Sequence, residues 1–306
     1  ARDDDAAGGS RVLVRVTGLD ALNRRLGRGA VDDALARLAK ALAAFAETRA
    51  DADCGRLNAS DFALLVGGGG DAAALADALH GKLLDALGGE VGERLRLGAC
   101  AYLPGEQPGP VLARADAVLA AAELGVGRTL DAGPTDALPP YDSAQAWRAG
   151  LGATLDADHL ELAAFPVLRD DGSLLHEEAP VRLLLEGRWR TAAQFLPWAA
   201  RLALLPAIAA RVVRAALQQL EHDRSRQLAI NLSAAALRDA GFRATLHEVL
   251  RHRPGLARRL WIEVQEAAAL RLAGVALWLG VGDPQTAGGD GQHDGGHRPG
   301  IGIQAD

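Results

Sequence analysis

The sequence lacks the features that mark secreted, membrane-spanning and nucleic-acid-binding proteins. It has only two cysteines, Cys54 and Cys100, in 306 residues, which is typical of a reduced, cytosolic protein. No apolar run reaches the length of a membrane span, and no signal peptide is visible. The formal net charge of -6 gives no reason to expect nucleic acid or an anionic membrane as a general partner.

Other residue types are also missing or rare. Methionine is absent, aromatic residues make up 4% of the chain, and the only lysines are Lys40 and Lys82. Arginine supplies the rest of the 33 basic residues, which we interpret as a bias of genome composition rather than a functional signal. Apolar residues make up 49% of the chain, and a length of 306 residues suffices for about two domains with sizeable cores.

Three short apolar stretches organise the second half: residues 174–184 (LLHEEAPVRLL), 227–233 (QLAINLS) and 259–266 (RLWIEVQE). Helical sequence separates them, which predicts βαβ units and a parallel sheet. Each carries a hard oxygen ligand at or near its end, namely Glu178, Asn231 and Glu263. If the sheet closes as a barrel, these strand ends form the active face, where such ligands suit a hard divalent cation.

The first half has an α+β pattern. Residues 1–10 are polar and acidic and predict a disordered arm. Alternating or apolar runs predict strands at 11–17, 56–66 and 96–103. Helical spacing predicts helices at 31–46, 71–87 and 111–124, the second with Asp71 as N-cap. We expect an antiparallel sheet with helices packed on it.

Local patterns also predict a connection between the halves and further elements of the second half. Proline and turn formers at 131–141 mark a boundary, and 142–155 has helical character, so we expect a linker and connecting helix at 136–156. A further strand pair is predicted at 159–168 and 174–184, joined by a hairpin turn at 170–173. A last strand is predicted at 274–280, and the glycine-rich tail 281–306 predicts disorder.

The motifs resemble a known family. EEAPVR, INLS and IEVQE are similar to the E-A-L-x-R, N-L-S and E-x-T-E motifs of EAL domains, barrels that bind or hydrolyse cyclic di-GMP. The first half resembles a GGDEF domain whose signature has decayed to NASDF at 58–62. The resemblance, most similar to LapD-like receptors, implies a degenerate GGDEF domain at 11–135. It also implies the first part of an incomplete, TIM-like EAL barrel at 157–280, and it stops at the tail.

The resemblance also implies a ligand site. Glu178 matches the metal-ligand glutamate and Arg182 the phosphate-binding arginine of the EAL signature. The remaining expected ligand contacts are Phe165, Pro166 and Val167 at the floor, with Asn231 and Glu263 on the later strands. Glu178, Asn231 and Glu263 would also hold any residual metal. The alternative for Glu178 and Arg182 is a structural salt bridge between them.

Several family positions are lost, which argues against catalysis. In the GGDEF half, Arg15 and Thr17 stand where the family has acidic residues, and the signature loop lacks both glycines. In the EAL half, Phe165 replaces a glutamine, strand 274–280 lacks two metal-binding aspartates, and no lysine follows Lys82. We therefore expect no catalytic residue and no required cofactor.

The expected function is that of a cyclic di-GMP receptor in signal transduction. A weak phosphodiesterase with Mg or Mn, and a scaffold that binds no nucleotide, remain alternatives. The resemblance further implies cyclic di-GMP as partner and allows a homodimer. It places this chain in the cytosolic part of an inner-membrane protein whose membrane and periplasmic sensory region lies outside this sequence.

Overall fold

The computed structural model describes residues 8–124, 130–132, 139–265 and 300–304. The chain divides into two compact units, Ala1–Trp147 and Arg148–Asp306, and each is described by itself. Among the described residues, no helix is both long enough and apolar enough to cross a lipid bilayer.

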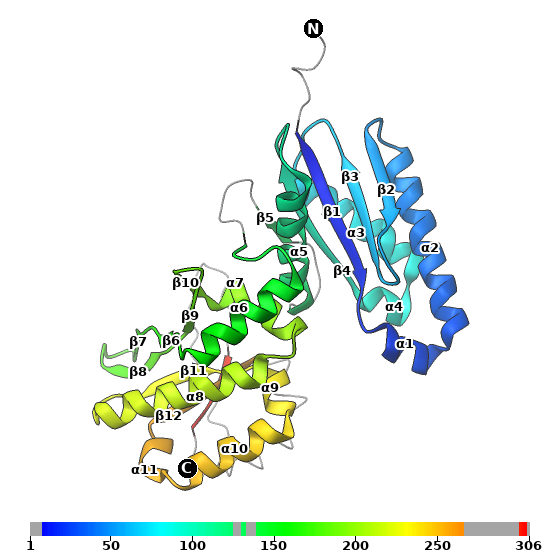
Figure 1. The fold of residues 1–306 in the computed structure, drawn as a ribbon. Coiled ribbons are helices and arrows are strands. Elements are labelled where there is room, and N and C mark those ends of the chain that lie inside the picture. Colours follow the sequence, from blue (N-terminus) through cyan, green and yellow to red (C-terminus); the bar gives the residue numbers. More distant parts are fainter. Residues whose placement is uncertain (1–7, 125–129, 133–138, 266–299, 305–306) are drawn as a thin grey trace. The chain divides into compact units, whose positions relative to one another are not determined.

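A five-stranded sheet with the order β2-β3-β1-β4-β5 forms the centre of the first unit (Figure 1). Strand β1 runs antiparallel to both of its neighbours, and β2 runs antiparallel to β3. Strand β5 is parallel to β4, because helix α5 carries the chain back between them. The predicted antiparallel sheet is thus confirmed for four strands. Their bounds are β1 Gly9–Val16, β2 Ala52–Arg56, β3 Asp61–Val66, β4 Leu95–Tyr102 and β5 Leu130–Ala132.

Helices cover both faces of this sheet. Alternate residues of β1, Val12 and Val14 among them, belong to the large core shared with α2 and α3. Leu13, between them, belongs to a smaller core with Ala115 and Leu119 of α5. This alternation is what a strand buried on two sides requires. The helices are α1 Leu19–Leu26, α2 Arg28–Glu47, α3 Ala72–Leu87, α4 Gly89–Glu93 and α5 Pro108–Leu124.

Two predictions for the first unit are wrong in detail. Strand β1 already begins at Gly9, because Gly9 and Ser10 pair with β4, so the disordered arm cannot include them. The range 56–66, predicted as a single strand, instead holds the last residue of β2, the hairpin turn and β3. The hairpin tip turns because the side chain of Asn58 accepts hydrogen bonds from the amides of Ser60 and Asp61 at 2.9 and 3.0 Å.

Gly98 in β4 marks the closest approach between the sheet and α5. A Cβ atom there would lie 2.7 Å from the carbonyl oxygen of Ala115 and even closer to the amide nitrogen of Leu119. Both obstacles are backbone, so Gly98→Ala is expected to lower the free energy of unfolding by about 1–3 kcal/mol. Urea denaturation measures this loss against Gly55→Ala, a strand position with open space. Equal stability of the two variants would contradict the close packing.

The second unit contains two sheets. One is an antiparallel sheet in the order β10-β9-β6, and the other has the order β13-β12-β11-β8-β7. In the second sheet β8, β11 and β12 are parallel, which confirms the predicted parallel strands, while the edge strands β7 and β13 are antiparallel to their neighbours. The strands are β6 Leu160–Leu162, β7 Phe165–Leu168, β8 Leu174–Glu178, β9 Val181–Leu185, β10 Arg188–Thr191, β11 Leu228–Asn231, β12 Leu260–Gln265 and β13 Gly300–Gln304.

Helices connect the parallel strands, as the βαβ pattern predicts. Helices α7 and α8 lie between β8 and β11 in the chain, and α9, α10 and α11 lie between β11 and β12. Helix α8 packs on β11 and β12 (Figure 1), whose residues Leu228, Ile230 and Ile262 are buried. The helices are α6 Ala144–Asp156, α7 Ala192–Arg201, α8 Leu205–His222, α9 Ala234–Arg238, α10 Ala240–Arg251 and α11 Pro254–Ala257.

Two strand predictions for the second unit are also wrong. Residues 159–168 form β6 and β7, and residues 174–184 form β8 and most of β9, with one member of each pair in each sheet. The second break falls at Pro180, which has no amide hydrogen for a sheet ladder. Residues 300–304 form β13, so the tail is not disordered there. The strand predicted at 274–280 lies outside the described residues, and the described strands form an open sheet.

Candidate functional site

The predicted strand-end ligands lie on one face of the five-stranded sheet. Glu178 is the last residue of β8 and stands opposite Ala229 of β11. Two residues after Ala229, Asn231 ends β11 and stands opposite Glu263 of β12. Because register partners share a face and side chains alternate, Glu178, Asn231 and Glu263 all project from the same side. Their role as ligands stays a prediction.

Strand β7 adds two of the three predicted floor residues to this face. Phe165 stands opposite Glu178, and Val167 stands opposite His176, so both share the face of Glu178. Pro166 lies between them and therefore faces the other way. Phe165 is 50% exposed, so its apolar ring is accessible to a partner next to the carboxylate of Glu178.

Arg182 does not lie on this sheet face. It belongs to β9 in the three-stranded sheet, where it stands opposite Glu161. Its Nη1 atom is 3.8 Å from Oε1 of Glu161, and the two side chains are 40% and 41% exposed. The structural alternative of a salt bridge with Glu178 is wrong, since Glu161 is the recorded partner. The chain reaches Arg182 directly after the carboxyl end of β8, the end at which Glu178 lies.

The adjacent carboxylates Glu177 and Glu178 have different surroundings. Glu177 projects from the opposite face and accepts a hydrogen bond from Nε of Arg226 at 2.6 Å. That contact joins β8 to the residues preceding β11, so Glu177 serves the structure of the sheet. Glu178 alone of the pair belongs to the candidate site.

Sequence reasoning missed two residues of this face, His176 and Trp261. Their ring centroids are 5.1 Å apart, and Nε2 of His176 is 3.9 Å from Oε1 of Glu263. These side chains come from β8 and β12, the two neighbours of β11 in the sheet. The available signal was alternation, because each lies two residues before a predicted ligand on the same strand.

The His176 side chain is enclosed. The residue is 8% exposed, and its Nδ1 atom is buried without a hydrogen-bond partner. Burial lowers the pKa of His176, while the charge of Glu178 acts in the opposite direction. The neutral ring is therefore the favoured form near neutral pH. Beside it, Nε1 of Trp261 donates a hydrogen bond to Oε1 of Gln227 at 3.3 Å.

Metal binding by Glu178, Asn231 and Glu263 stays a prediction. Across the described ranges, no three or more histidine, cysteine, aspartate or glutamate side chains are grouped so that they could hold a metal ion. The predicted set includes the amide of Asn231, which is not one of those residue types. On this face the polar side chains lie beside the stacked rings of His176 and Trp261.

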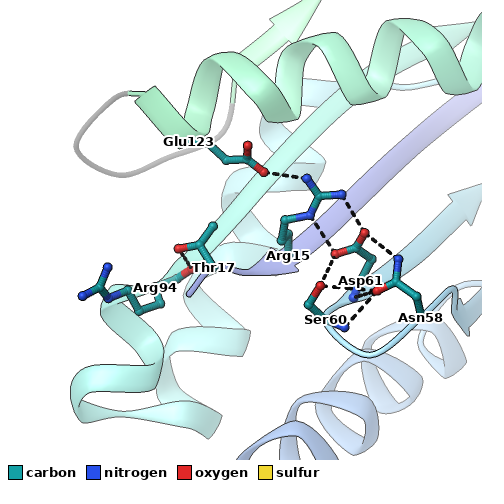
Figure 2. Close-up of polar contacts among 7 residues, drawn as sticks. All are labelled: Arg15, Thr17, Asn58, Ser60, Asp61, Arg94 and Glu123. Carbon is teal, nitrogen blue, oxygen red and sulfur yellow. Dashed lines mark hydrogen bonds and ion pairs between the residues drawn. The ribbon is translucent and has the colours of Figure 1, made fainter. Parts of the chain in front are cut away.

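In the first unit an ion-pair network includes Asp61, a residue of the degenerate signature (Figure 2). Nε and Nη2 of Arg15 donate to the two carboxylate oxygens of Asp61 at 2.7 and 2.6 Å. Nη1 of Arg15 donates to Oε1 of Glu123, near the end of α5, at 2.7 Å. The hydroxyl of Thr17 donates to the backbone carbonyl of Arg94 at 3.2 Å. A guanidinium and a hydroxyl thus stand where the resemblance places acidic metal ligands.

The hairpin tip uses its polar groups internally. Besides the two amides that donate to Asn58, the amides of Leu57 and Asn58 donate to the carbonyl of Asp61 at 2.8 and 3.3 Å. The guanidinium of Arg56 donates to the carbonyls of Asn58 and Ala59 at 2.9 and 2.7 Å. A phosphate at this tip would have to break these bonds to reach backbone amides, so the loop is a closed structural turn.

The network gives Asp61 a pH-dependent contribution to stability. Burial raises the pKa of Asp61, but hydrogen bonds from Arg15, Asn58 and Ser60 outweigh it and lower that pKa from 3.8 to about 2. The stabilisation, about 2 kcal/mol for this shift, is present above pH 4 and is lost as the pH falls through 2. Urea denaturation between pH 5 and about 2 measures it. Asp61→Asn is expected to flatten this part of the profile, and an unchanged slope would contradict the assignment.

Comparison with known proteins agrees with this architecture. Residues 148–278 match the family model described as the EAL domain. No curated protein matches the chain. Vibrio cholerae LapD, an S helix-GGDEF-EAL structure bound to c-di-GMP, is 19% identical with a TM-score of 0.68, covering 88% of this chain and 66% of that chain. This chain therefore spans just under two thirds of the length of that structure.

Two further solved structures resemble the chain with lower TM-scores. The apo form of Vibrio cholerae LapD is 18% identical with a TM-score of 0.45, covering 90% of this chain and 67% of that one. The EAL domain of Xanthomonas citri FimX in complex with c-diGMP is 25% identical with a TM-score of 0.39, covering 44% of this chain and 57% of that one.

Proposed function

Because the chain has the tandem GGDEF-EAL fold and carries an EAL domain at residues 148–278, we propose that it is a cyclic di-GMP receptor that does not turn its ligand over. In this proposal the EAL domain binds the dinucleotide, and the first unit serves signal transduction without making the dinucleotide. The proposal is made for this chain alone, which covers part of the length of the tandem structure it resembles.

The observation that carries the proposal is the shared sheet face at the carboxyl end of the parallel strands. There Phe165 offers an exposed ring to a purine, and Asn231 and Glu263 offer hydrogen-bonding groups to a base or ribose. Ligands of α/β sheets bind at this end of the strands. Arg182 follows that end in the chain. Its ion pair with Glu161 is long and exposed, so the guanidinium group is available to donate two hydrogen bonds to a phosphate.

Two features support a receptor over an enzyme. Hydrolysis of a phosphodiester by a metal-activated water needs carboxylates that converge on the ion, and the described side chains contain no such group. Synthesis in the first unit would need a metal and phosphate site at the signature, where Arg15 neutralises Asp61 and the hairpin tip is bonded to itself.

Calorimetric titration of the full chain with cyclic di-GMP, with and without Mg, tests the proposal. We expect saturable binding in both conditions, and unchanged dinucleotide by chromatography after prolonged incubation. Glu263→Ala is expected to weaken binding, whereas Glu248→Ala, an exposed change on α10, is the matched control. Appearance of the linear dinucleotide with Mg or Mn would show a weak phosphodiesterase instead, and absence of binding would leave a scaffold.

A further inference from the structure

We infer that a cleft at the amino end of β11 and β12 binds a phosphate-bearing anion, at a site separate from the candidate site on the sheet face. The cleft has a volume of about 500 Å³ and is lined by Glu221, Arg224, Arg253, Gly255, Leu256 and Arg259. Three of these residues carry a guanidinium group and one carries a carboxylate, so we call it the arginine cleft. The inference does not rest on the proposed function.

The two chain segments that lead into β11 and β12 are strongly basic. Residues 222–226 (HDRSR) and 251–259 (RHRPGLARR) contain six arginines and one carboxylate, that of Asp223. The whole chain, by contrast, has a formal net charge of -6. Strands β11 and β12 are parallel neighbours, so the segments that precede them meet at one edge of the sheet. A positive region of this kind on an acidic protein attracts anions to one place.

Arg259 joins the two segments and forms the fixed part of the cleft. Its Nη2 atom donates to the carbonyl of Leu220 at 2.6 Å, and its Nη1 atom donates to the carbonyl of Asp223 at 2.9 Å. These carbonyls lie at the end of α8, whose partial negative charge offsets only part of the charge of the guanidinium. Within the described ranges no carboxylate forms an ion pair with Arg259. The bonds therefore hold the guanidinium in place and leave most of its charge to act on the cleft.

Arg224 and Arg253 supply the donors that can turn to a ligand. Arg224 is exposed, and it makes no recorded hydrogen bond or ion pair in the part of the chain that the structure describes. Arg253 pairs with Glu221 at 2.7 Å, but the two side chains are 47% and 49% exposed, and such surface pairs are weak. Guanidinium groups match the oxygens of a phosphate in geometry and charge. The excess of positive charge in the lining favours an anion with two or more negative charges.

The arginine cleft is separate from the candidate ligand site. Asn231 and Glu263 lie at the carboxyl ends of β11 and β12, whereas the cleft lies before the first residues of both strands. Arg259 precedes Glu263 by four residues, which corresponds to roughly 13 Å along a strand. A single phosphate in the cleft is therefore too far from the sheet face to contact it.

Calorimetric titration of the full chain with pyrophosphate tests the inference. One saturable site is expected, and Arg224→Ala is expected to weaken its affinity at least about tenfold. Arg251→Ala is the matched control, because Arg251 is an exposed arginine at the end of α10 that does not line the cleft. It removes the same charge and is expected to change the affinity little, since salt screens exposed charges outside the site. Circular dichroism verifies the fold of each variant.

Gly255→Asp tests the cleft without removing an arginine. A Cβ atom at Gly255 would have no heavy atom within 4 Å, so the substitution meets no obstacle. The added carboxylate is expected to repel the anion and to weaken the binding of pyrophosphate at least about tenfold. Gly255→Ala is the neutral control and is expected to bind like the natural protein.

Sedimentation with vesicles distinguishes two sources of the phosphate. Vesicles of equal parts phosphatidylcholine and phosphatidylglycerol are compared with vesicles of phosphatidylcholine alone. Binding of pyrophosphate in solution indicates a soluble ligand. Binding to the anionic vesicles alone, lost in Arg224→Ala and Gly255→Asp, indicates the phosphate of a lipid headgroup.

The other outcomes overturn the inference. These are binding to neither probe, and binding that Arg224→Ala and Gly255→Asp leave unchanged. Loss of pyrophosphate binding with Arg182→Ala in their place would put the phosphate beyond the carboxyl end of β8 and would also overturn it. The proposed function is judged separately, by titration with cyclic di-GMP and by substitutions at the sheet face.

Discussion

Replacing Arg15 by methionine is expected to lower the free energy of unfolding of the first unit by about 3 kcal/mol. The side chains of its partners Asp61 and Glu123 are only 11% and 15% exposed, so both carboxylates would lose the charge of Arg15 in a poorly hydrated place. Methionine keeps the length and packing of the side chain, and the loss therefore reports on charge. Urea denaturation followed by circular dichroism measures the change.

Arg11→Met is the matched control for this experiment. Arg11 lies on the same strand and the same face, but its recorded hydrogen bond is a long, exposed one of 3.5 Å to the carbonyl of Pro108. We expect a change within about 0.5 kcal/mol for this variant. The double variant Arg15→Met/Asp61→Asn is expected to recover part of the loss, because one uncompensated charge is removed. Similar losses of unfolding free energy for the Arg11 and Arg15 variants would contradict a stabilising role for the ion pairs of Arg15.

Several elements of the first unit could be predicted from local sequence pattern alone. Alternation predicted β1, helical spacing predicted α2, and a single residue predicted the start of α3. Asp71 does cap that helix, accepting hydrogen bonds from the amides of Ala73 and Ala74 at 2.9 and 3.2 Å. These features depend on neighbours in the sequence, which is why the sequence alone sufficed.

What the sequence could not predict depends on partners far apart in the chain. The break between β8 and β9 arises because β8 pairs with β11 while β9 pairs with β6 and β10. Pro180 was a visible signal for a break, but nothing local shows which sheet each part joins. In the same way, Glu161 as the partner of Arg182 follows from the register of β6 and β9.

The candidate site was predicted in part for the same reason. Motif order identified Glu178, Asn231 and Glu263, and alternation correctly placed Glu263 opposite to Ile262 on its strand. The contact of His176 with Glu263 joins β8 to β12 across β11, so it depends on the order of the strands in the sheet, which no motif contains.

Arg182→Ala is expected to weaken binding of cyclic di-GMP by about 10- to 100-fold, if the proposed function holds. A bidentate guanidinium contact with a phosphate is charge-assisted, and alanine removes all of it. The fold should not suffer, because the pair with Glu161 is 3.8 Å long and well exposed, and such pairs contribute about 0–1 kcal/mol. Calorimetric titration and thermal denaturation of the same samples separate the two effects.

Arg188→Ala is the control. Arg188 is an exposed arginine of the same three-stranded sheet, but it begins β10 and so comes after β9 in the chain, not after the carboxyl end of β8. Both variants carry the same loss of charge, so a general electrostatic attraction for the dinucleotide would weaken equally in the two. A selective loss with Arg182→Ala would mean that the ligand phosphate lies beyond the carboxyl end of β8. Equal affinities of Arg182→Ala and the natural protein would remove Arg182 from the site, and would leave recognition to the sheet face of Phe165, Asn231 and Glu263.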